Sequence, residues 1–513
     1  MTDPLLGPTG TAFLLIYLAS LVLVGWAGRR AREEDSLSDF YLGGRGLGTI
    51  VLFLTLYATQ YSGNTLVGYA GVSYRTGFKF LVSVIFMMSI VGGYLLFAPR
   101  LQALATRYQF LTLGDYLQHR YNDRRITLLA TVLATWALAN YILSNLKAIG
   151  FIVDTTTGGR IPFAYGILLL SLIMVIYETL GGFRSVAWTD AIQGVILLAG
   201  CLVIFMAIQI HYGGLNEATT ILAARSPHLL EAPDFAGTRT WLSTVAIIFL
   251  GVPFYPQAIQ RIYAARSAHS LKRAFQFMVF MPLVTTFFIF YIGIVAAAHI
   301  PGLDRAASET VALRILTELA QAAPSLSWML VLFVAAVVAA IMSTVDSALL
   351  AISSIVTQDI YRPSHPNASQ MQLTRVGKLS SWAIMAVAAV LAIILPQTIW
   401  RLTEIKLELL CQVAPAVFLG INIPSLSKRS IFTGMLAGTA VTVGLMSANW
   451  LGFDISTKPF AIHSGIWGVL VNFALVGATH LRDRQNLTPR HYVVTAPFMG
   501  ALSMAQTMQA PHS

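Results

Sequence analysis

A short run of small oxygen-bearing side chains stands inside a strongly apolar stretch of this chain. Ser343, Thr344 and Ser347 follow Ala340 at spacings i+3, i+4 and i+7, so a helix would place all four on one face. Asp346 adds one carboxylate beside that face. Hydroxyl oxygens and a single negative charge suit a small hard cation, and an ionisable residue at bilayer depth indicates a functional site. The alternative is that the hydroxyls only bond to carbonyls of their own or a neighbouring helix.

The composition is that of an all-α integral membrane protein. The chain is 56% hydrophobic and 11% charged, against about 25% charged residues in a soluble domain. The net charge of +11 comes from Lys and Arg scattered over many short loops, so we expect no nucleic-acid partner. Cys201 and Cys411 lie in apolar runs and predict neither a disulfide framework nor a metal motif. Because no nucleophile, base and orienting group recur together, we also expect no enzyme.

Hydropathy predicts thirteen transmembrane helices, each about 20 residues long because the hydrocarbon layer is about 30 Å thick. The Lys and Arg residues concentrate in the connections on the same side as the first loop, which predicts that this side is cytoplasmic. The N-terminus would then lie outside, in a multi-pass protein of the cell inner (plasma) membrane. The helices are expected near residues 11–27, 49–72, 79–98, 127–153, 162–180, 187–211, 241–260, 275–299, 327–357, 379–397, 405–424, 430–450 and 463–481.

Two connections are expected to carry structure of their own. Residues 98–126 alternate Arg with apolar residues, which is typical of an interfacial helix lying on anionic membrane lipid. Residues 212–240 predict a long external loop with a short helix over the outer vestibule. The chain turns polar after Arg482, and we expect a cytoplasmic tail over 482–513.

Two of the expected helices carry interruptions. The second has a polar run from Thr59 to Thr65 with Gly63 inside it, and the seventh contains Gly251, Pro253 and Pro256. Backbone left unpaired at membrane depth is tolerated only where it lines a cavity or a bound ion. Interrupted helices at corresponding places in two halves of a chain indicate a transporter with inverted repeats and a site near the bilayer midplane. A pair of ordinary kinks is the alternative.

Three motifs resemble those of the sodium/solute symporter family, which includes proline, pantothenate, sugar, sialic-acid and monocarboxylate symporters. They read FYLGGRGLG at 40–48, GGFRSVAWTDAIQG at 181–194 and MSTVDSALLAISSIVTQDIYR at 342–362. The resemblance covers about residues 10–480. It implies the leucine-transporter fold, thirteen helices with an external N-terminus, and solute uptake coupled to sodium.

The domain organisation that follows has four parts. Residues 1–27 form an extra N-terminal helix, and 28–424 form the transport core of two inverted five-helix repeats. The repeats are expected at about 49–211 and 241–424. Two further helices occupy 425–481, and 482–513 form the tail. We expect the protein to function as a monomer.

The resemblance also implies which residues bind sodium. The positions that match the family's main sodium site contribute carbonyls and hydroxyls and are Ala58, Tyr61, Ala340, Ser343 and Thr344. Some members bind a second sodium, for which the matching candidates are Asp190, Ser343, Asp346 and Ser347. Two carboxylates would then face one ion. One of them is alternatively protonated, or paired with Arg184.

The solute site is expected between the two broken helices and their neighbours. The residues that we expect in its wall are Gln60, Asn64, Phe249, Pro253, Tyr255 and Gln257. Gln60 and Asn64 replace an Asp and a Trp of the proline branch, which puts proline in doubt. Lys147, in the unusually polar fourth helix, either meets an anion or extends toward the membrane interface.

The expected function is therefore sodium-coupled symport of a small organic solute by alternating access. We expect the solute to be a small organic anion, such as a carboxylate, because the pantothenate branch of the family shares the GGFR and MST sequence motifs. A neutral or zwitterionic metabolite such as an amino acid is the alternative. A sensor or channel that has kept the fold without coupled transport is a further alternative.

Overall fold

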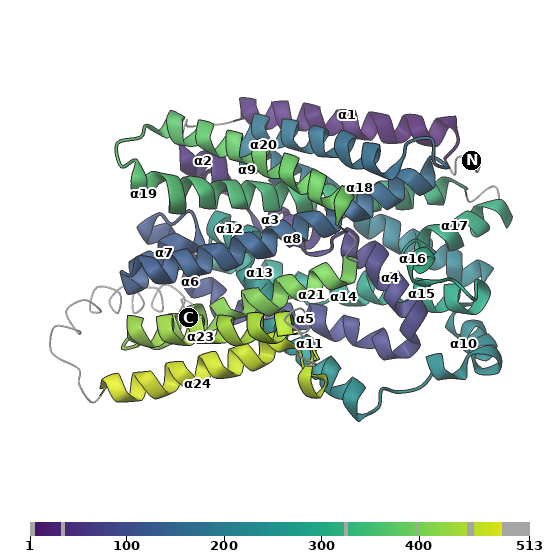
Figure 1. Ribbon diagram of the computed structural model, residues 1–513. Coiled ribbons are helices and arrows are strands. Elements are labelled where there is room, and N and C mark those ends of the chain that lie inside the picture. The colour runs from purple at the N-terminus through teal and green to yellow at the C-terminus, as the bar shows by residue number, and fades with distance from the viewer. Residues whose placement is uncertain (1–5, 32–35, 323–326, 396–398, 449–455, 485–513) are drawn as a thin grey trace, which may run out of the picture.

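The computed structural model describes residues 6–31, 36–322, 327–395, 399–448 and 456–484. The side chains of Asn64, residues 399–403 and Arg484 lie outside this description. The described chain is helical, with one isolated bridge between Leu47 and Ala265. Its long helices run roughly side by side, with α1 (Pro8–Arg30) at one edge of the molecule and α24 (Ser464–Arg484) at the opposite edge (Figure 1).

Ten helices among the described residues are long and apolar enough to cross a membrane. The longest, α9 (Phe163–His211), is bent at Gly182, whose φ of 64° and ψ of −152° suit glycine alone. Helix α9 therefore counts as one helix by its length, but it consists of two segments that meet at a sharp bend. Thirteen crossings therefore stay a prediction, because helix length does not count crossings. The other long or membrane-embedded helices include α5 (Val82–Leu95), α8 (Arg124–Thr156), α13 (Ala268–Met278), α15 (Thr286–His299), α20 (Gln370–Ile394) and α23 (Lys428–Ser447).

Helix α18 (Ser327–Ile355) forms the centre of the molecule. Every residue from Phe333 to Ile355 is buried, and the helix packs against α9, α8, α20 and α3 (Thr49–Gln60). The peripheral α1 lies along α9, where Gly25 touches Tyr177 and Gly28 touches Ser185. The polar residues of α18 consequently face other helices and are shielded from lipid.

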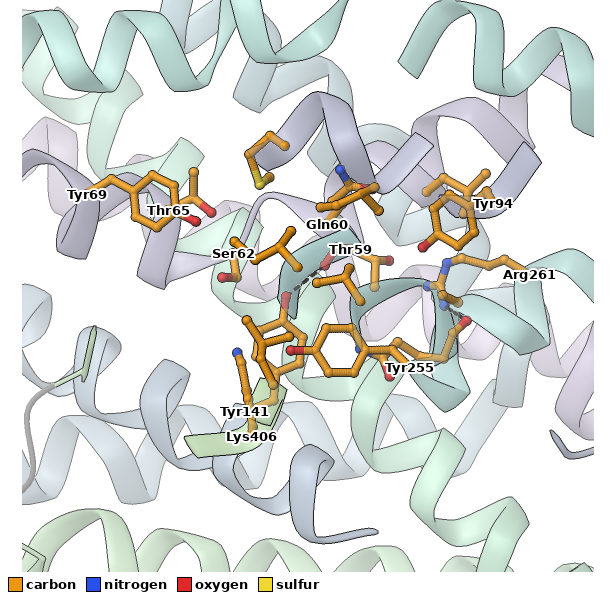
Figure 2. A pocket seen from close by; sticks show the side chains of 18 residues that line it. Thr59, Gln60, Ser62, Thr65, Tyr69, Tyr94, Tyr141, Tyr255, Arg261 and Lys406 are labelled. Carbon is orange, nitrogen blue, oxygen red and sulfur yellow. Dashed lines mark hydrogen bonds between the residues drawn. The ribbon is translucent and has the colours of Figure 1, made fainter. Parts of the chain in front are cut away.

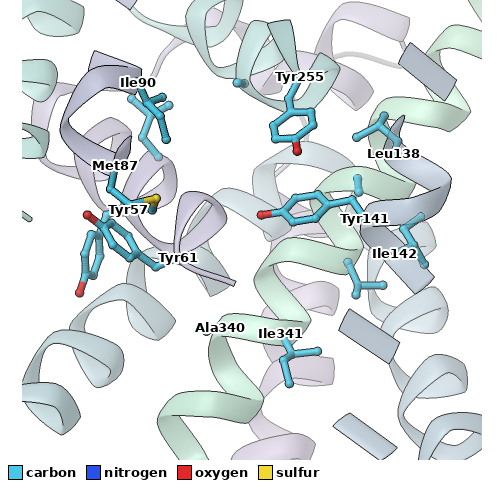
Figure 3. Packing of buried hydrophobic residues seen from close by; sticks show 14 of the residues in the cluster. Tyr57, Tyr61, Met87, Ile90, Leu138, Tyr141, Ile142, Tyr255, Ala340 and Ile341 are labelled. Carbon is cyan, nitrogen blue, oxygen red and sulfur yellow. The ribbon is translucent and has the colours of Figure 1, made fainter. Parts of the chain in front are cut away.

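The second span is interrupted where the sequence predicted it. Helix α3 ends at Gln60, and Tyr61 has φ of −94° and ψ of 90°. The chain resumes through the π-helical turn η2 (Asn64–Gly68) and α4 (Tyr69–Thr76). The Gly63 N–H donates to Asn145 Oδ1 at 3.0 Å, and a Cβ at Gly63 would lie 2.3 Å from Ile341 of α18. The break is therefore tied to α8 and pressed against α18, near Ala340 and Ile341 (Figure 3).

The seventh span is also broken, as expected from its glycine and prolines. It comprises α11 (Phe235–Gly251), the 3-10 turn η5 (Val252–Phe254) and α12 (Pro256–Ala264). Tyr255, with φ of −55° and ψ of 127°, separates the last two. Pro256 opens α12 at a position where the missing N–H is harmless. Both breaks border the same central region, and α12 packs against α3 and α18.

The two structured connections predicted from the sequence are present as short helices. Residues 98–126 contain α6 (Ala98–Tyr108) and α7 (Leu113–Tyr121), and residues 212–240 contain α10 (Gly214–Arg225). The remaining segments are short helices and helical turns. They are α2 (Leu37–Leu42), η1 (Gly43–Arg45), η3 (Gly77–Leu81), η4 (Pro227–Leu229), α14 (Met281–Val284), α16 (Arg305–Ser308), α17 (Val311–Ala322), η7 (Val356–Tyr361), α19 (Arg362–Ser364), α21 (Ile399–Leu410), η8 (Cys411–Val413), α22 (Ala414–Asn422) and η10 (Pro459–Ala461).

Candidate functional site

A cavity of about 50 Å³ lies between the two helix breaks. Its wall combines residues of α3, α5, α8, η5, α12 and α21, so both halves of the chain contribute (Figure 2). On this measure one water molecule needs about 10 to 15 Å³, so the cavity holds only a few waters and must widen before a larger metabolite enters. The polar and aromatic residues of the wall are Thr59, Gln60, Ser62, Thr65, Tyr69, Tyr94, Tyr141, Tyr255, Gln257, Arg261 and Lys406.

Three residues that the sequence placed in the solute site line this cavity: Gln60, Tyr255 and Gln257. Phe249 and Pro253 are not among the residues that line it. The turn of α11 into η5 directs both toward α5, where Phe249 approaches Gly92 and Pro253 approaches Gly93. The side chain of the remaining candidate, Asn64, lies outside the described residues.

Gln60 presents its amide to the cavity without a partner. Neither Nε2 nor Oε1 has a hydrogen bond within the described structure, although both atoms are buried. The Oε1 atom of Gln257 is in the same state. A buried amide without partners costs free energy, so these two side chains are suited to binding a polar group in the cavity.

Lys406 is the wall residue that the sequence reasoning missed. Its side chain is 2% exposed, and its Nζ lies 3.6 Å from the ring centre of Tyr141 and 5.7 Å from that of Tyr255. The two tyrosine rings are stacked, with centres 5.2 Å apart and an interplanar angle of 8°. The available signal was a lysine inside the apolar span expected at 405–424.

The carbonyl of Thr59, at the end of α3, collects two hydroxyl groups. Tyr141 Oη donates to it at 3.1 Å, and Thr344 Oγ1 approaches it at 3.5 Å. The tyrosine bond is the dashed line beside Thr59 in Figure 2. Thr344 of α18 thus lies at the helix break.

The other positions expected at the main sodium site surround the same region. Ala58 and Tyr61 flank Thr59 and Gln60 and are fully buried, as are Ala340 and Ser343 on α18. No described residue donates a hydrogen bond to the carbonyl of Ala58, which leaves that oxygen free for a cation. The exposed carbonyls of a helix end carry the negative end of its dipole, which favours a positive ion. Ser343 Oγ is engaged elsewhere, donating to Asp190 Oδ1 at 2.6 Å.

Asp190 is the centre of a buried ion pair that the sequence did not predict. Arg261 Nη2 lies 2.6 Å from Asp190 Oδ2, with side chains 1% and 0% exposed. The same nitrogen donates to Ser347 Oγ at 2.5 Å, and Arg261 Nε donates to Thr55 Oγ1 at 2.8 Å. Thr55 in turn donates to Asp190. A guanidinium therefore contacts two of the candidates for a second sodium site.

Asp346 faces a different neighbour from Asp190. Its Oδ2 accepts a hydrogen bond from Tyr177 Oη of α9 at 2.6 Å, and its Oδ1 accepts one from the Ser347 N–H at 2.6 Å. These donors satisfy the carboxylate without a metal ion. The two carboxylates that were expected to share one ion thus have separate protein partners.

Three basic side chains near the site have partners within the protein. Arg184 pairs with Asp39 at 2.6 Å and not with Asp190 or Asp346, which excludes one alternative drawn from the sequence. Arg261 lies inside α12, where its Nη1 donates to the Gln257 carbonyl one helical turn earlier at 3.0 Å. Lys147 donates to the carbonyl of Leu395 at the end of α20 and is absent from the cavity wall.

Comparison with known proteins places this architecture in a family. The family model described as "Sodium:solute symporter family" matches residues 40–438. The chain belongs to the sodium:solute symporter family. This result confirms the resemblance drawn from the three motifs.

Characterised relatives of this symporter act on different solutes. The osmoregulated proline transporter OpuE of Bacillus subtilis is 26% identical over 470 residues, covering 89% of this chain and 93% of OpuE. The sodium/pantothenate symporter of Escherichia coli is 26% identical over 385 residues, covering 74% of this chain and 77% of that protein. The relatives therefore support sodium as a coupling ion and leave the solute open.

The fold of the symporter matches a solved structure. A Na⁺-coupled sialic acid symporter, in a substrate-bound outward-open state, superposes with a TM-score of 0.75 at 21% identity. The match covers 92% of this chain and 97% of the other. At this identity the likeness concerns the fold, and it confirms the all-α transporter architecture expected from the sequence.

Proposed function

We propose that this symporter carries a small organic anion, such as a carboxylate, together with sodium. The observation that carries the proposal is the placement of the cavity. It adjoins both the Thr59 carbonyl, where Thr344 of α18 approaches, and the Gln60 amide, which has no partner. Sodium and solute would thus bind on either side of one irregular backbone segment, so each can stabilise the geometry that the other requires.

The charge of the cavity wall supports an anionic solute. Its described residues include Arg261 and Lys406 but no Asp or Glu. Asp190 neutralises Arg261 from outside the wall, whereas Lys406 has an aromatic neighbour in place of a carboxylate. The positive charge of Lys406 beside a bound sodium ion is unfavourable unless an anionic solute binds with them.

The coupling ion is proposed to bind at the main site, through Ala58, Tyr61, Ala340, Ser343 and Thr344. Sodium here is cargo that moves with the solute, and alternating access would open the cavity to each side in turn. The proposed location is the cell inner (plasma) membrane, with the N-terminus outside, the C-terminus cytoplasmic, and a monomer as the functional unit.

A neutral or zwitterionic solute is the second candidate. The 26% identity to OpuE favours it, since that relative is a proline transporter. Gln60 can also hydrogen-bond a zwitterion, because an amide has donors and acceptors.

Uptake into proteoliposomes tests the proposal. We expect an inward sodium gradient, but not a potassium gradient of equal size, to drive accumulation of a radiolabelled carboxylate from a panel of lactate, pyruvate and benzoate. Labelled L-proline in parallel vesicles tests the second candidate. Uptake that ignores the sodium gradient would contradict symport, and sodium-driven uptake of L-proline alone would replace the anion with a zwitterion.

A further inference from the structure

Lys406 is a buried ammonium with no anionic or hydrogen-bonding partner among the described residues. It lies on α21, lines the cavity, and is 2% exposed. Its contacts are with aromatic rings, at 3.6 Å to the centre of Tyr141 and 5.7 Å to that of Tyr255. A ring face replaces only part of the hydration that a buried cation loses. The ammonium thus retains unused hydrogen-bonding capacity.

Two other buried basic side chains show what satisfied cations look like in this protein. Arg261 uses Nε, Nη1 and Nη2 for hydrogen bonds and pairs with Asp190. Lys147 donates to the carbonyl of Leu395. A lysine retained only for structure would be expected to show similar partners. Lys406 shows none, and it is the one of the three whose charge faces the cavity without compensation.

The surroundings of Lys406 define a ligand with two ends. In the view of Figure 2, Lys406 and Gln60 lie on opposite sides of the cavity, with the rings of Tyr141 and Tyr255 beside Lys406. Met87 and Ile90 add apolar surface to the wall. A ligand that fits this arrangement has one anionic group for Lys406, an apolar or planar middle against the tyrosine rings, and a polar group within reach of Gln60.

We propose that Lys406 binds the carboxylate of the transported solute and selects anions over neutral analogues. This inference rests on the proposed function and names the residue that determines its substrate class. Tyr141 holds Lys406 in place through its ring, while its hydroxyl donates to the Thr59 carbonyl at 3.1 Å. One tyrosine therefore contacts both the solute-binding ammonium and the helix break where sodium is proposed to bind.

Matched pairs of ligands test the charge preference directly. Thermal unfolding of the purified protein is measured in sodium with lactate against lactamide, benzoate against benzamide, and L-proline. We expect at least one carboxylate to stabilise the wild type. Its amide should bind the wild type at least tenfold less tightly. The Lys406→Met variant should bind that carboxylate about tenfold to a hundredfold more weakly and lose the preference over the amide. Lys406→Arg, which keeps the charge, should retain the preference.

Lys147→Met is the matched control, because it removes a second buried lysine that does not line the cavity. We expect it to leave carboxylate affinity unchanged, even if the protein melts at a lower temperature. Sodium alone should still stabilise Lys406→Met, which shows that the variant is folded. The wild type is also titrated with sodium chloride and with sodium sulfate. If one of these anions stabilises the protein more than the other, the partner of Lys406 is an inorganic ion, and the proposal is overturned.

Failure of this inference is distinct from failure of the proposed function. If carboxylates stabilise the wild type and Lys406→Met equally, symport of an anion stands but Lys406 does not bind it. If sodium stabilises the wild type while no carboxylate of the panel does, Lys406 is not a carboxylate site. If sodium itself has no effect and drives no uptake, the proposed function falls first.

Discussion

At the scale of single residues, the cavity wall contains polar groups that have no partner in the described structure. Gln60 and Gln257 keep amide atoms without partners, and Lys406 keeps an ammonium over an aromatic ring. Nearby buried groups such as Asp190 and Asp346 are each held by at least two donors. Unpaired buried groups are costly, and these three side chains face a cavity, so they are suited to binding a polar solute.

The first prediction is that Gln60 contacts the solute. Gln60→Ala leaves the carbonyls of the α3 break in place, because the change is confined to the side chain. Solute affinity should fall by about tenfold to a hundredfold, the usual effect of losing one or two buried hydrogen bonds of roughly 1 to 3 kcal/mol. Equilibrium binding of a labelled carboxylate in saturating sodium measures it. Loss of sodium-induced stabilisation together with the fold, at unchanged solute affinity, would instead make Gln60 a structural bridge.

The second prediction concerns the hydroxyls of α18. Thr344→Ala removes the group that approaches the Thr59 carbonyl, and Ser343→Ala removes the donor to Asp190. Each change should raise the sodium concentration for half-maximal uptake by about tenfold, because each removes one oxygen from the proposed cage.

Ser354→Ala is the control for this pair. Ser354 is also buried on α18, but its hydroxyl donates to Ala351 and accepts from Gln260 Nε2, and it contacts neither the Thr59 carbonyl nor Asp190. It should leave the sodium dependence unchanged. A Ser343→Ala, Thr344→Ala double variant with wild-type sodium dependence would remove both residues from the site.

At the scale of elements, the sequence predicted the interruptions well and the side-chain partners poorly. Gly63 and the glycine and prolines of residues 251–256 are local signals, because each limits the backbone at its own position. The breaks of α3 and of α11 to α12 are accordingly present. The pairing of Asp190 with Arg261 spans 71 residues and depends on tertiary packing, because α9 and α12 both lie against α3 and α18.

Proximity along the chain was misleading for the same reason. Arg184, six residues from Asp190, pairs with Asp39 of α2 instead. Lys406 was visible as a lysine in an apolar span, but its position over Tyr141 depends on the packing of α21 against α8. Local chemistry thus predicted where the backbone breaks, and tertiary packing determined which groups meet there.

The third prediction is that the bend in α9 requires glycine at 182. Gly182 has φ of 64°, and an added Cβ would lie 2.6 Å from the carbonyl oxygen of Phe40. Gly182→Ala should therefore destabilise the protein by about 1 to 3 kcal/mol or more, measured as a lower unfolding temperature in detergent. Gly444→Ala is the control, because Gly444 lies in helix α23 with no atom within 4 Å of an added Cβ. Equal unfolding temperatures for the two variants would show that the bend tolerates alanine.

At the scale of the whole molecule, the four buried charged residues assigned above to the cavity and to the candidate second sodium site balance one another before any ligand binds. Asp190 and Asp346 contribute two negative charges when ionised, and Arg261 and Lys406 contribute two positive charges. Net charge in a low-dielectric interior is unfavourable. A cargo of one sodium and one monovalent anion adds no net charge to this set, whereas a second sodium would add one.

The last prediction is that one sodium ion accompanies each monocarboxylate and that transport is electroneutral. The guanidinium of Arg261 already contacts Asp190 and Ser347, two of the groups expected to form a second sodium site. It lies 2.6 Å from the Asp190 carboxylate, so a second cation would have to displace a buried ion pair. The measurement is the solute accumulation ratio at a series of sodium gradients in proteoliposomes, with membrane potential set by potassium and valinomycin. We expect accumulation to follow the first power of the sodium ratio and to be independent of potential.

Asp346→Asn should leave this stoichiometry unchanged, because Tyr177 and the Ser347 N–H already satisfy Asp346. An accumulation that follows the square of the sodium ratio and responds to potential, both lost in Asp346→Asn, would establish a second sodium site at Asp346.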